Sequence, residues 1–263
     1  LMIAAFFAGR NLFGFVSLGA IIILLMYLLG ILVAVCVAWI LKQTILKAPP
    51  PPLIMEMPPY RLPRPQTVLQ TITSRSFLFV KRAGTVILTI SIVLWALAAF
   101  PHYTPQAGAS ANNELPAIQS GEQLRQSFAG RAGRFIEPVI APLGFDWKMG
   151  VGLIASFAAR ETAVSTFSII YNVGADSDAK SSSLIDAVRN AKREDGRPAW
   201  TPLVAVSMMV FFVLACQCMS TVAIVRRETN SWKWPLFMVG YMTVVAYVAS
   251  LIVFQGGKAL GLS

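Results

Sequence analysis

The chain has 263 residues, of which 56% are hydrophobic and 13% are charged, and its formal net charge is +10. An ordinary soluble domain carries about 25% charged residues, so this composition excludes a soluble globular protein and indicates one that lies in a lipid bilayer. The positive charge would suit a nucleic-acid-binding protein. However, the basic residues cluster between long apolar runs, as they do in the loops of membrane proteins, so nucleic acid is not an expected partner.

Five apolar segments approach or exceed the length of about 20 residues that a helix needs to cross a bilayer. They lie at residues 15–41, 78–100, 149–171, 202–225 and 235–255. The sequence therefore predicts an all-α fold, a polytopic transmembrane helical bundle. The leading residues LMIAAFFA resemble the end of an earlier helix rather than a signal peptide, because no basic segment precedes them. We therefore expect a fragment or one part of a split polypeptide.

A proline-rich segment follows the first predicted span. Half of the sixteen prolines fall between Pro49 and Pro65, and proline fixes φ and lacks a backbone donor, so this segment should be extended and stiff. Seven cations surround Glu56 in this region, which by the positive-inside rule places it in the cytoplasm. These cations are Lys42, Lys47, Arg61, Arg64, Arg75, Lys81 and Arg82.

The predicted spans divide the chain into three parts and assign each loop to a side. Residues 1–41 hold the end of an upstream helix and the first span, 42–77 form the cytoplasmic loop, and 78–263 form the C-terminal module with an external loop at 101–147. Alternation then places 173–201 inside, the turn Arg226–Trp234 outside and the C-terminus inside. The cations of that turn conflict with the positive-inside rule, which leaves open that 149–171 re-enters the membrane instead of crossing it.

The segment 149–171 carries two charges, Arg160 and Glu161, in an otherwise apolar run. Neighbouring helix residues point about 100° apart, so these two side chains do not pair with each other and each needs its own partner. They could form structural ion pairs that lock the bundle, Glu161 could take part in a transport path, or the helix could break here. Hydroxyls extend the face of Glu161 into a polar stripe, which comprises Thr162, Ser165, Thr166 and Ser168.

The segment 202–225 carries polar side chains at bilayer depth, where they are expected to face protein or a cavity. They are Cys216, Gln217, Cys218, Ser220 and Thr221. In a regular helix Cys216 and Cys218 point about 200° apart and cannot grip one ion together. Thiolate sulfur suits soft or borderline transition metals, but buried cysteines are also common packing residues. Both interpretations remain open at this point.

Three longer runs, in this order, resemble the C-terminal membrane region of the bacterial ferrous iron transporter family FeoB. They are PPLIMEMPPYRLP, PLGFDWKMGVGLIASFAARETAVST and QCMSTVAIVRRETNSWKWPLF. The resemblance implies a gate-type helical module through which Fe²⁺ passes. Cys218 matches the family's cysteine through the pattern Gln-Cys-x-Ser-Thr and would be a transient soft ligand, with Cys216 a weaker candidate. Glu161 would be a hard ligand or charge balance, Arg160 a structural charge, and the path would be lined by Ser165, Thr166 and Thr221.

The same resemblance implies partners for the chain. The family begins with a cytoplasmic GTP-binding domain carrying a GxxxxGK[ST] loop, and here Gly257-Lys258 is followed by Ala259. We therefore expect no enzymatic activity and no cofactor in this chain, with Fe²⁺ as the transported ion and GTP acting only through an upstream domain. Expected partners are the bilayer, that upstream GTP-binding and first-gate region, small cytoplasmic Feo accessory proteins and further copies in a homo-oligomer. The expected location is the bacterial inner membrane, crossed several times.

Two alternative functions remain open. The chain could be a non-conducting scaffold or regulatory partner of a split transporter, or a gate-containing carrier of nucleosides or another solute. An organic carrier should bring aromatic and amide side chains together at its site. The polar positions here are mostly Cys, Ser, Thr and Glu, which favours an ion.

Overall fold

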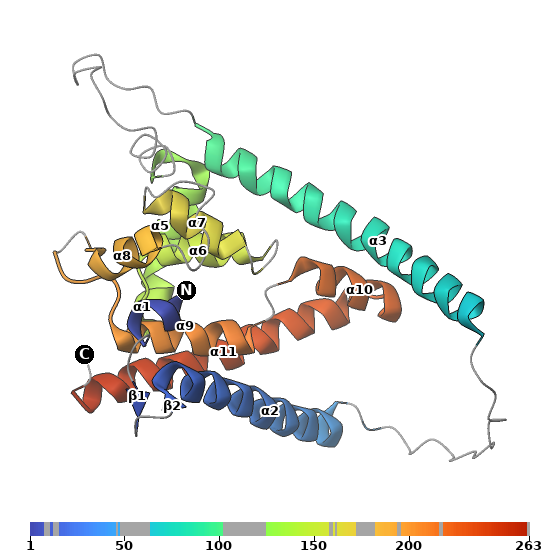
Figure 1. Ribbon diagram of the computed structural model, residues 1–263, viewed down its shortest axis with the longest axis horizontal. Helices are drawn as coiled ribbons and strands as arrows, with labels where there is room; N and C mark the ends of the chain where they lie inside the picture. Colours follow the sequence, from blue (N-terminus) through green and yellow to red (C-terminus); the bar gives the residue numbers. More distant parts are fainter. Residues whose placement is uncertain are drawn as a thin grey trace.

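The computed structural model describes residues 1–7, 11–12, 16–45, 47, 64–101, 125–157, 160, 162–171, 182–193, 196–215 and 218–261. These residues confirm the predicted helical bundle, with one short antiparallel hairpin of β1 (Asn11–Leu12) and β2 (Val16–Ser17). The helices are shown in Figure 1. In chain order they are α1 (Met2–Phe6), α2 (Leu18–Thr44), α3 (Pro65–Ala99), α5 (Phe128–Ile140), the 3₁₀ turn η1 (Ala141–Leu143), α6 (Trp147–Ser156), α7 (Thr162–Ile170), α8 (Ser182–Asn190), α9 (Pro202–Leu214), α10 (Met219–Thr229) and α11 (Lys233–Ala259).

Three helical segments of the described chain are long and apolar enough to cross a membrane: α2, the α9–α10 segment and α11. The outer face of α2 exposes large apolar side chains, among them Leu24, Leu32 and Trp39. In water such a face would be unfavourable, whereas lipid tails cover it without cost. The chain is therefore a membrane protein.

Helix α3 begins earlier than the sequence suggested. Residues 65–77, which we assigned to the cytoplasmic loop, form its first turns. Pro65 occupies the first helical position, where its missing N–H costs nothing and its fixed φ suits the helix. The rest of the proline-rich segment, residues 48–63, lies outside the described residues.

Buried hydrogen bonds connect α9 to α11 inside the bundle. The hydroxyls of Ser207 and Ser250 lie 2.8 Å apart, and Ser250 also donates to the carbonyl of Ser207 at 2.7 Å. Ser207 reaches a third group, the carbonyl of Leu143, at 3.1 Å. Both serines are fully buried, and such satisfied hydroxyls hold helices together where water is absent.

The predicted span 149–171 is wrong as a single crossing. The structure forms two short helices there, α6 with 10 residues and α7 with 9, and neither reaches the length that a bilayer requires. The two helices pack against each other as a hairpin. Gly152 of α6 permits this close approach, because a Cβ at that position would lie 2.6 Å from the ring of Phe167 in α7. We call this element the α6–α7 hairpin.

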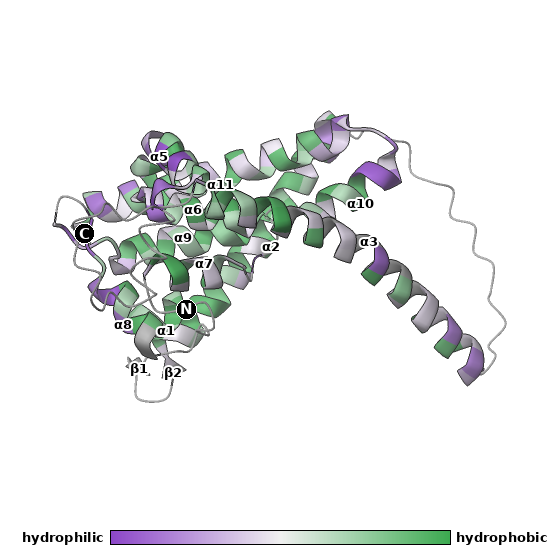
Figure 2. Cartoon of the chain, turned by 90° about the horizontal axis from the view of Figure 1, so that it is seen from above, coloured by the Kyte–Doolittle hydropathy of each residue, from purple (hydrophilic) through white to green (hydrophobic). Residues whose placement is uncertain are grey.

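The hairpin changes which loops share a side. In Figure 1 the end of α2, the start of α3 and the α10–α11 turn lie toward one end of the molecule, which we call the loop end. The region of α8, the start of α9 and the end of α11 lie toward the other, the hairpin end. Hydrophilic residues gather at both ends in Figure 2, and the helices between them are mostly hydrophobic.

Relative to the start of α3, this arrangement differs from three of the predicted placements. The turn Arg226–Trp234 lies at the same end, while α8, the start of α9 and the end of α11 lie opposite. The physical reason is that the α6–α7 hairpin returns to the end from which it started, as in the re-entrant alternative left open for 149–171. The correction removes the conflict with the positive-inside rule, since Arg226, Arg227 and Lys233 now lie at the same end as Lys42.

Candidate functional site at two facing helix interruptions

The segment predicted as one helix at 202–225 is interrupted in its middle. Helix α9 ends at Leu214 and α10 begins at Met219, with Cys218 as the N-cap residue in an extended conformation (φ −140°, ψ 108°). The expected angle of about 200° between Cys216 and Cys218 applied to a regular helix, and Cys218 does not lie in one. Cys216 and Gln217 themselves lie outside the described residues.

The interruption is held by the α6–α7 hairpin, which has an interruption of its own between Ser156 and Thr162. The N–H of Met219 donates to the carbonyl of Phe157 at 3.1 Å. The guanidinium of Arg160 donates to the carbonyl of Ala215 at 3.2 Å. Backbone groups released by a break inside a membrane need such partners from neighbouring elements, so each interruption helps to satisfy the other. Glu161 lies outside the described residues.

Cys218 stands at the start of α10 beside two hydroxyl residues. Its thiol lies close to the backbone N–H groups of Ser220 and Thr221, and a helix N-terminus favours a thiolate over a thiol. The side chain is only partly buried, so it is accessible from the interruption. Thr221 is exposed. This arrangement can present a sulfur ligand to a borderline metal ion.

Ser220 differs from the other buried serines. Its side chain is 7% exposed, and the one polar group described beside its hydroxyl is the Cys218 thiol. A thiol is a weak hydrogen-bond partner. A weakly satisfied oxygen therefore lies beside the Cys218 sulfur.

The hydroxyls of α7 lie in different environments. Thr162 donates to the carbonyl of Ala155 at 2.6 Å and Thr166 to that of Thr162 at 2.8 Å. Ser168 is fully buried, whereas Ser165 is exposed. These side chains follow the predicted helical spacing, but two of them bond to the backbone of their own hairpin.

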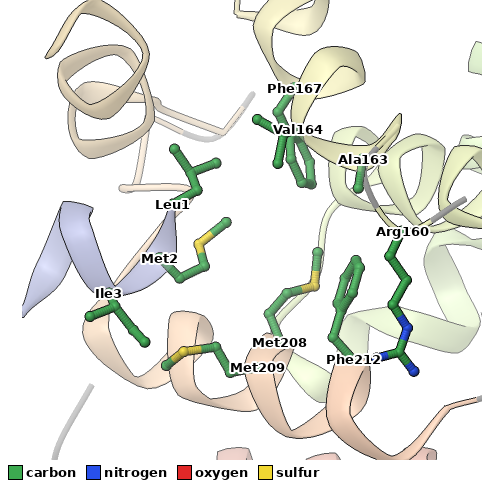
Figure 3. A pocket seen from close by; sticks show the side chains of 10 residues that line it. All are labelled: Leu1, Met2, Ile3, Arg160, Ala163, Val164, Phe167, Met208, Met209 and Phe212. Atoms are coloured by element: carbon green, nitrogen blue, oxygen red, sulfur yellow. The ribbon is translucent and has the colours of Figure 1, made fainter. Parts of the chain in front are cut away.

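Two adjoining cavities lie beside Arg160. One, of about 300 Å³, lies between α1, α7 and α9, and the other, of about 550 Å³, lies between α1, α2 and α9. Both are lined by Ile3, Arg160, Met209 and Phe212. Figure 3 shows Arg160 extending beside Phe212 toward α9, with three thioethers nearby, those of Met2, Met208 and Met209. Cys218, Ser165, Thr166 and Thr221 line neither of these two cavities.

Sequence reasoning missed these cavity walls. Their residues come from α1, α2, α7 and α9, which lie far apart in the chain, and each one reads as ordinary apolar packing in its own helix. Arg160 is the only charged side chain among the described residues that line either cavity. Its position inside an apolar run was the one signal that pointed here.

The described residues do not form a closed metal site. No three His, Cys, Asp or Glu side chains come together among them. The lone-pair groups described at the interruption are instead the Cys218 thiol, the Ser220 hydroxyl and the Ala215 carbonyl. Such an open set suits an ion that binds transiently, because an ion that is held too tightly cannot leave a pathway.

A second polar cluster lies where the α6–α7 hairpin joins the bundle, outside the three long apolar segments. Asp146 caps α6 by accepting a hydrogen bond from the N–H of Met149 at 2.9 Å. Burial raises the pKa of Asp146 above its usual value, while Arg193 and Lys148 partly oppose the shift. Arg193 in turn donates to the carbonyl of Gly144. This cluster fixes the start of the hairpin.

Two family models match the chain. One, described as the C terminus of ferrous iron transport protein B, covers residues 23–75, and the other, named Gate and described as nucleoside recognition, covers residues 80–232. The second match includes both helix interruptions. No solved structure matches the chain.

Curated relatives cover nearly the whole chain. The Fe(2+) transporter FeoB of Leptospira interrogans is 42% identical over 256 residues, which are 97% of this chain and 36% of the relative. The Leptospira biflexa transporter is 37% identical over 262 residues, 99% of this chain and 36% of the relative. A fusion of Fe(2+) transport protein A with FeoB from Porphyromonas gingivalis is 33% identical over 280 residues, 98% of this chain and 32% of the relative. The chain thus spans about a third of the length of these relatives.

Proposed function

Because this chain belongs to the FeoB family and corresponds to the C-terminal part of its members, we propose that it forms the membrane permease part of a ferrous iron uptake system. The proposed route for Fe²⁺ passes the point where the α6–α7 hairpin meets the interruption between α9 and α10. The cargo ion would meet a few ligands there and leave again without being enclosed.

One observation carries this proposal: Cys218 caps α10 at an interruption that the hairpin holds by two hydrogen bonds. A thiolate is a good ligand for a borderline ion such as Fe²⁺, and the neighbouring hydroxyl of Ser220 and the carbonyls of α9 add hard oxygen ligands. Glu161 follows Arg160 directly in the hairpin and is proposed as a further oxygen ligand or charge balance. Cys216 is the weaker sulfur candidate, and Ser165, Thr166 and Thr221 are proposed to line the approach.

The wider setting follows from the relatives. The Porphyromonas gingivalis relative joins Fe(2+) transport protein A to FeoB in one chain, which supports a small Feo accessory protein as a partner here. We propose a multi-pass location in the bacterial inner membrane, with assembly into a homo-oligomer and with GTP acting through a separate upstream domain.

A nucleoside carrier is the main alternative, because the Gate model is described as nucleoside recognition. A nucleobase site would use amide and aromatic side chains for hydrogen bonding and stacking. Neither cavity is lined by an amide side chain among the described residues. The alternative predicts competition by nucleosides for Fe²⁺ uptake or uptake of nucleosides themselves.

A chimeric transporter tests the proposal. This chain would replace the matching C-terminal part of the Leptospira interrogans relative, and radioactive Fe²⁺ uptake would be measured in bacteria that lack iron import. We expect uptake by the chimera, a loss of at least tenfold in Cys218→Ser and little change in the control Cys36→Ser, which alters an exposed cysteine of α2. Uptake that survives Cys218→Ser at equal membrane levels would refute the role of Cys218.

A further inference from the structure

Arg160 occupies an unusual place for a charge in a membrane protein. Its guanidinium donates to the carbonyl of Ala215, the C-cap residue of α9. Its remaining neighbours in the two cavities are apolar, chiefly Ile3, Met209 and Phe212.

The end of a helix is a cation-binding position. The last carbonyls of α9 have no partners further along the helix, and the helix dipole makes that end partly negative. Because α9 stops inside the predicted membrane segment, this negative end lies within the molecule rather than in water. Arg160 supplies the positive charge that this end favours.

The start of α10 is the complementary half of the same interruption. It is partly positive and carries Cys218, whose thiol lies beside two N–H groups. Four residues separate the two helices, and the hairpin contacts both sides of the gap through Phe157 and Arg160. One short segment of the hairpin thus joins the carbonyl end of α9 to the start of α10.

We propose that Arg160 is a tethered cation that fills the carbonyl end of α9 until a metal ion displaces it. The inference rests on the proposed function, since it requires that Fe²⁺ binds at this interruption. A guanidinium on a flexible side chain can leave and return, and Arg160 is exposed to the cavities rather than locked in the core. Its return would help to expel the ion.

This competition sets the affinity for the ion. If Arg160 occupies the carbonyl end in about nine-tenths of the molecules, about one-tenth are free to bind Fe²⁺ there. The apparent affinity for Fe²⁺ is then about tenfold weaker. Weak binding is what conduction needs. Arg160 would thus be a specificity and release determinant, in addition to a structural charge.

The test measures Fe²⁺ binding without transport. The chain, carrying Cys36→Ala and Cys216→Ala, is placed in lipid nanodiscs, and the alkylation rate of Cys218 is followed as Fe²⁺ is raised under anaerobic conditions. The Fe²⁺ concentration that halves the alkylation rate reports the affinity. Arg160→Gln removes the tethered charge, Arg160→Lys keeps a charge with a different shape, and Arg131→Gln alters an exposed arginine of α5 as the control.

We expect the half-protecting concentration to fall about tenfold in Arg160→Gln, to fall about threefold in Arg160→Lys and to stay unchanged in Arg131→Gln. Added methylguanidinium should raise the half-protecting Fe²⁺ concentration of Arg160→Gln and leave that of the native protein unchanged. If Arg160→Gln does not fold, the half-protecting concentration measured for Arg160→Lys alone tests the tethered-cation role of Arg160. Protection in the native protein with no shift, or a rise, in the Arg160 variants would overturn the tethered-cation role alone. A native protein that Fe²⁺ does not protect would overturn the proposed role of Cys218 as well.

Discussion

At the scale of single residues, three side chains at the interruption differ in how their polar groups are satisfied. Arg160 bonds to a carbonyl, the Cys218 thiol lies beside N–H groups, and the Ser220 hydroxyl has only that thiol beside it. A thiol is a weak hydrogen-bond partner, so this buried hydroxyl is less well satisfied than that of Ser207. We therefore expect the Ser220 hydroxyl to take part when an ion binds to Cys218.

Ser220 and Ser207 provide a matched pair for this idea. Ser220→Ala removes a hydroxyl whose described neighbour is only the weakly bonding Cys218 thiol, so we expect a nearly unchanged melting temperature together with weaker Fe²⁺ protection of Cys218. Ser207→Ala removes a hydroxyl that contacts Leu143 and Ser250, so we expect a loss of about 1–3 kcal/mol of stability. Thermal unfolding in detergent compares the two. A Ser220→Ala protein as unstable as Ser207→Ala would show that Ser220 is structural.

Asp146 should make stability depend on pH. Burial raises its pKa in the folded state above the usual 3.8, so the folded protein holds the proton more tightly than the unfolded chain does. The stabilisation is full below about 3.8 and is lost as pH rises through the folded pKa. Asp146→Asn keeps an N-cap side chain without the charge.

The difference in melting temperature, native minus Asp146→Asn, should therefore become more favourable to the native protein as pH falls from neutral toward 4. Taking the difference cancels the titration of other carboxylates. A difference that moves the opposite way would mean that the Met149 N–H, Arg193 and Lys148 together outweigh burial at this site.

At the scale of elements, the α6–α7 hairpin depends on a close contact with α5. A Cβ on Gly133 of α5 would lie 2.7 Å from the backbone carbonyl of Trp147 and 2.6 Å from the side chain of Val151. The backbone of α6 cannot yield as a flexible side chain would, so any larger residue pushes the two helices apart. The position of the hairpin, and with it the contact at Ala215, follows from this packing.

Gly133→Ala is therefore expected to destabilise the protein although alanine is the better helix former. Gly240→Ala in α11 is the control, because a Cβ there meets nothing within 4 Å. That change should be neutral or stabilising by up to about 1 kcal/mol. Melting temperatures of the two variants in detergent compare these effects. Equal changes in melting temperature would argue against close α5–α6 packing.

The elements also separate what the sequence could predict from what it could not. Apolar length and periodicity predicted the helices α2 and α11, and the isolated charge Arg160 marked a special site. A break near Arg160 was one of the alternatives that the sequence left open, but the end of α9 at Leu214 was not predicted, because no proline or glycine lies between it and α10. These helix ends are held by hydrogen bonds between segments more than 50 residues apart, from the Met219 N–H to the Phe157 carbonyl and from the Arg160 side chain to the Ala215 carbonyl.

At the scale of the whole molecule, the hairpin determines which loops share a side. Single cysteines at Gln66, Glu228 and Lys258, each an exposed position, can be labelled with an impermeant thiol reagent in a background without native cysteines. We expect Gln66→Cys and Glu228→Cys to react from the cytoplasmic side and Lys258→Cys from the opposite side. Labelling of Glu228→Cys and Gln66→Cys from different sides would restore the extra crossing at 149–171.

The central claim is that the interruption between α9 and α10 binds a transition-metal ion through Cys218. Co²⁺ is a spectroscopic substitute for Fe²⁺, and its binding to a thiolate gives a ligand-to-metal charge-transfer absorption. In nanodiscs, the chain titrated with Co²⁺ should show this absorption, retain it in Cys36→Ser and lose it in Cys218→Ser. An absorption that persists in Cys218→Ser, or that never appears in the native chain, would contradict the claim.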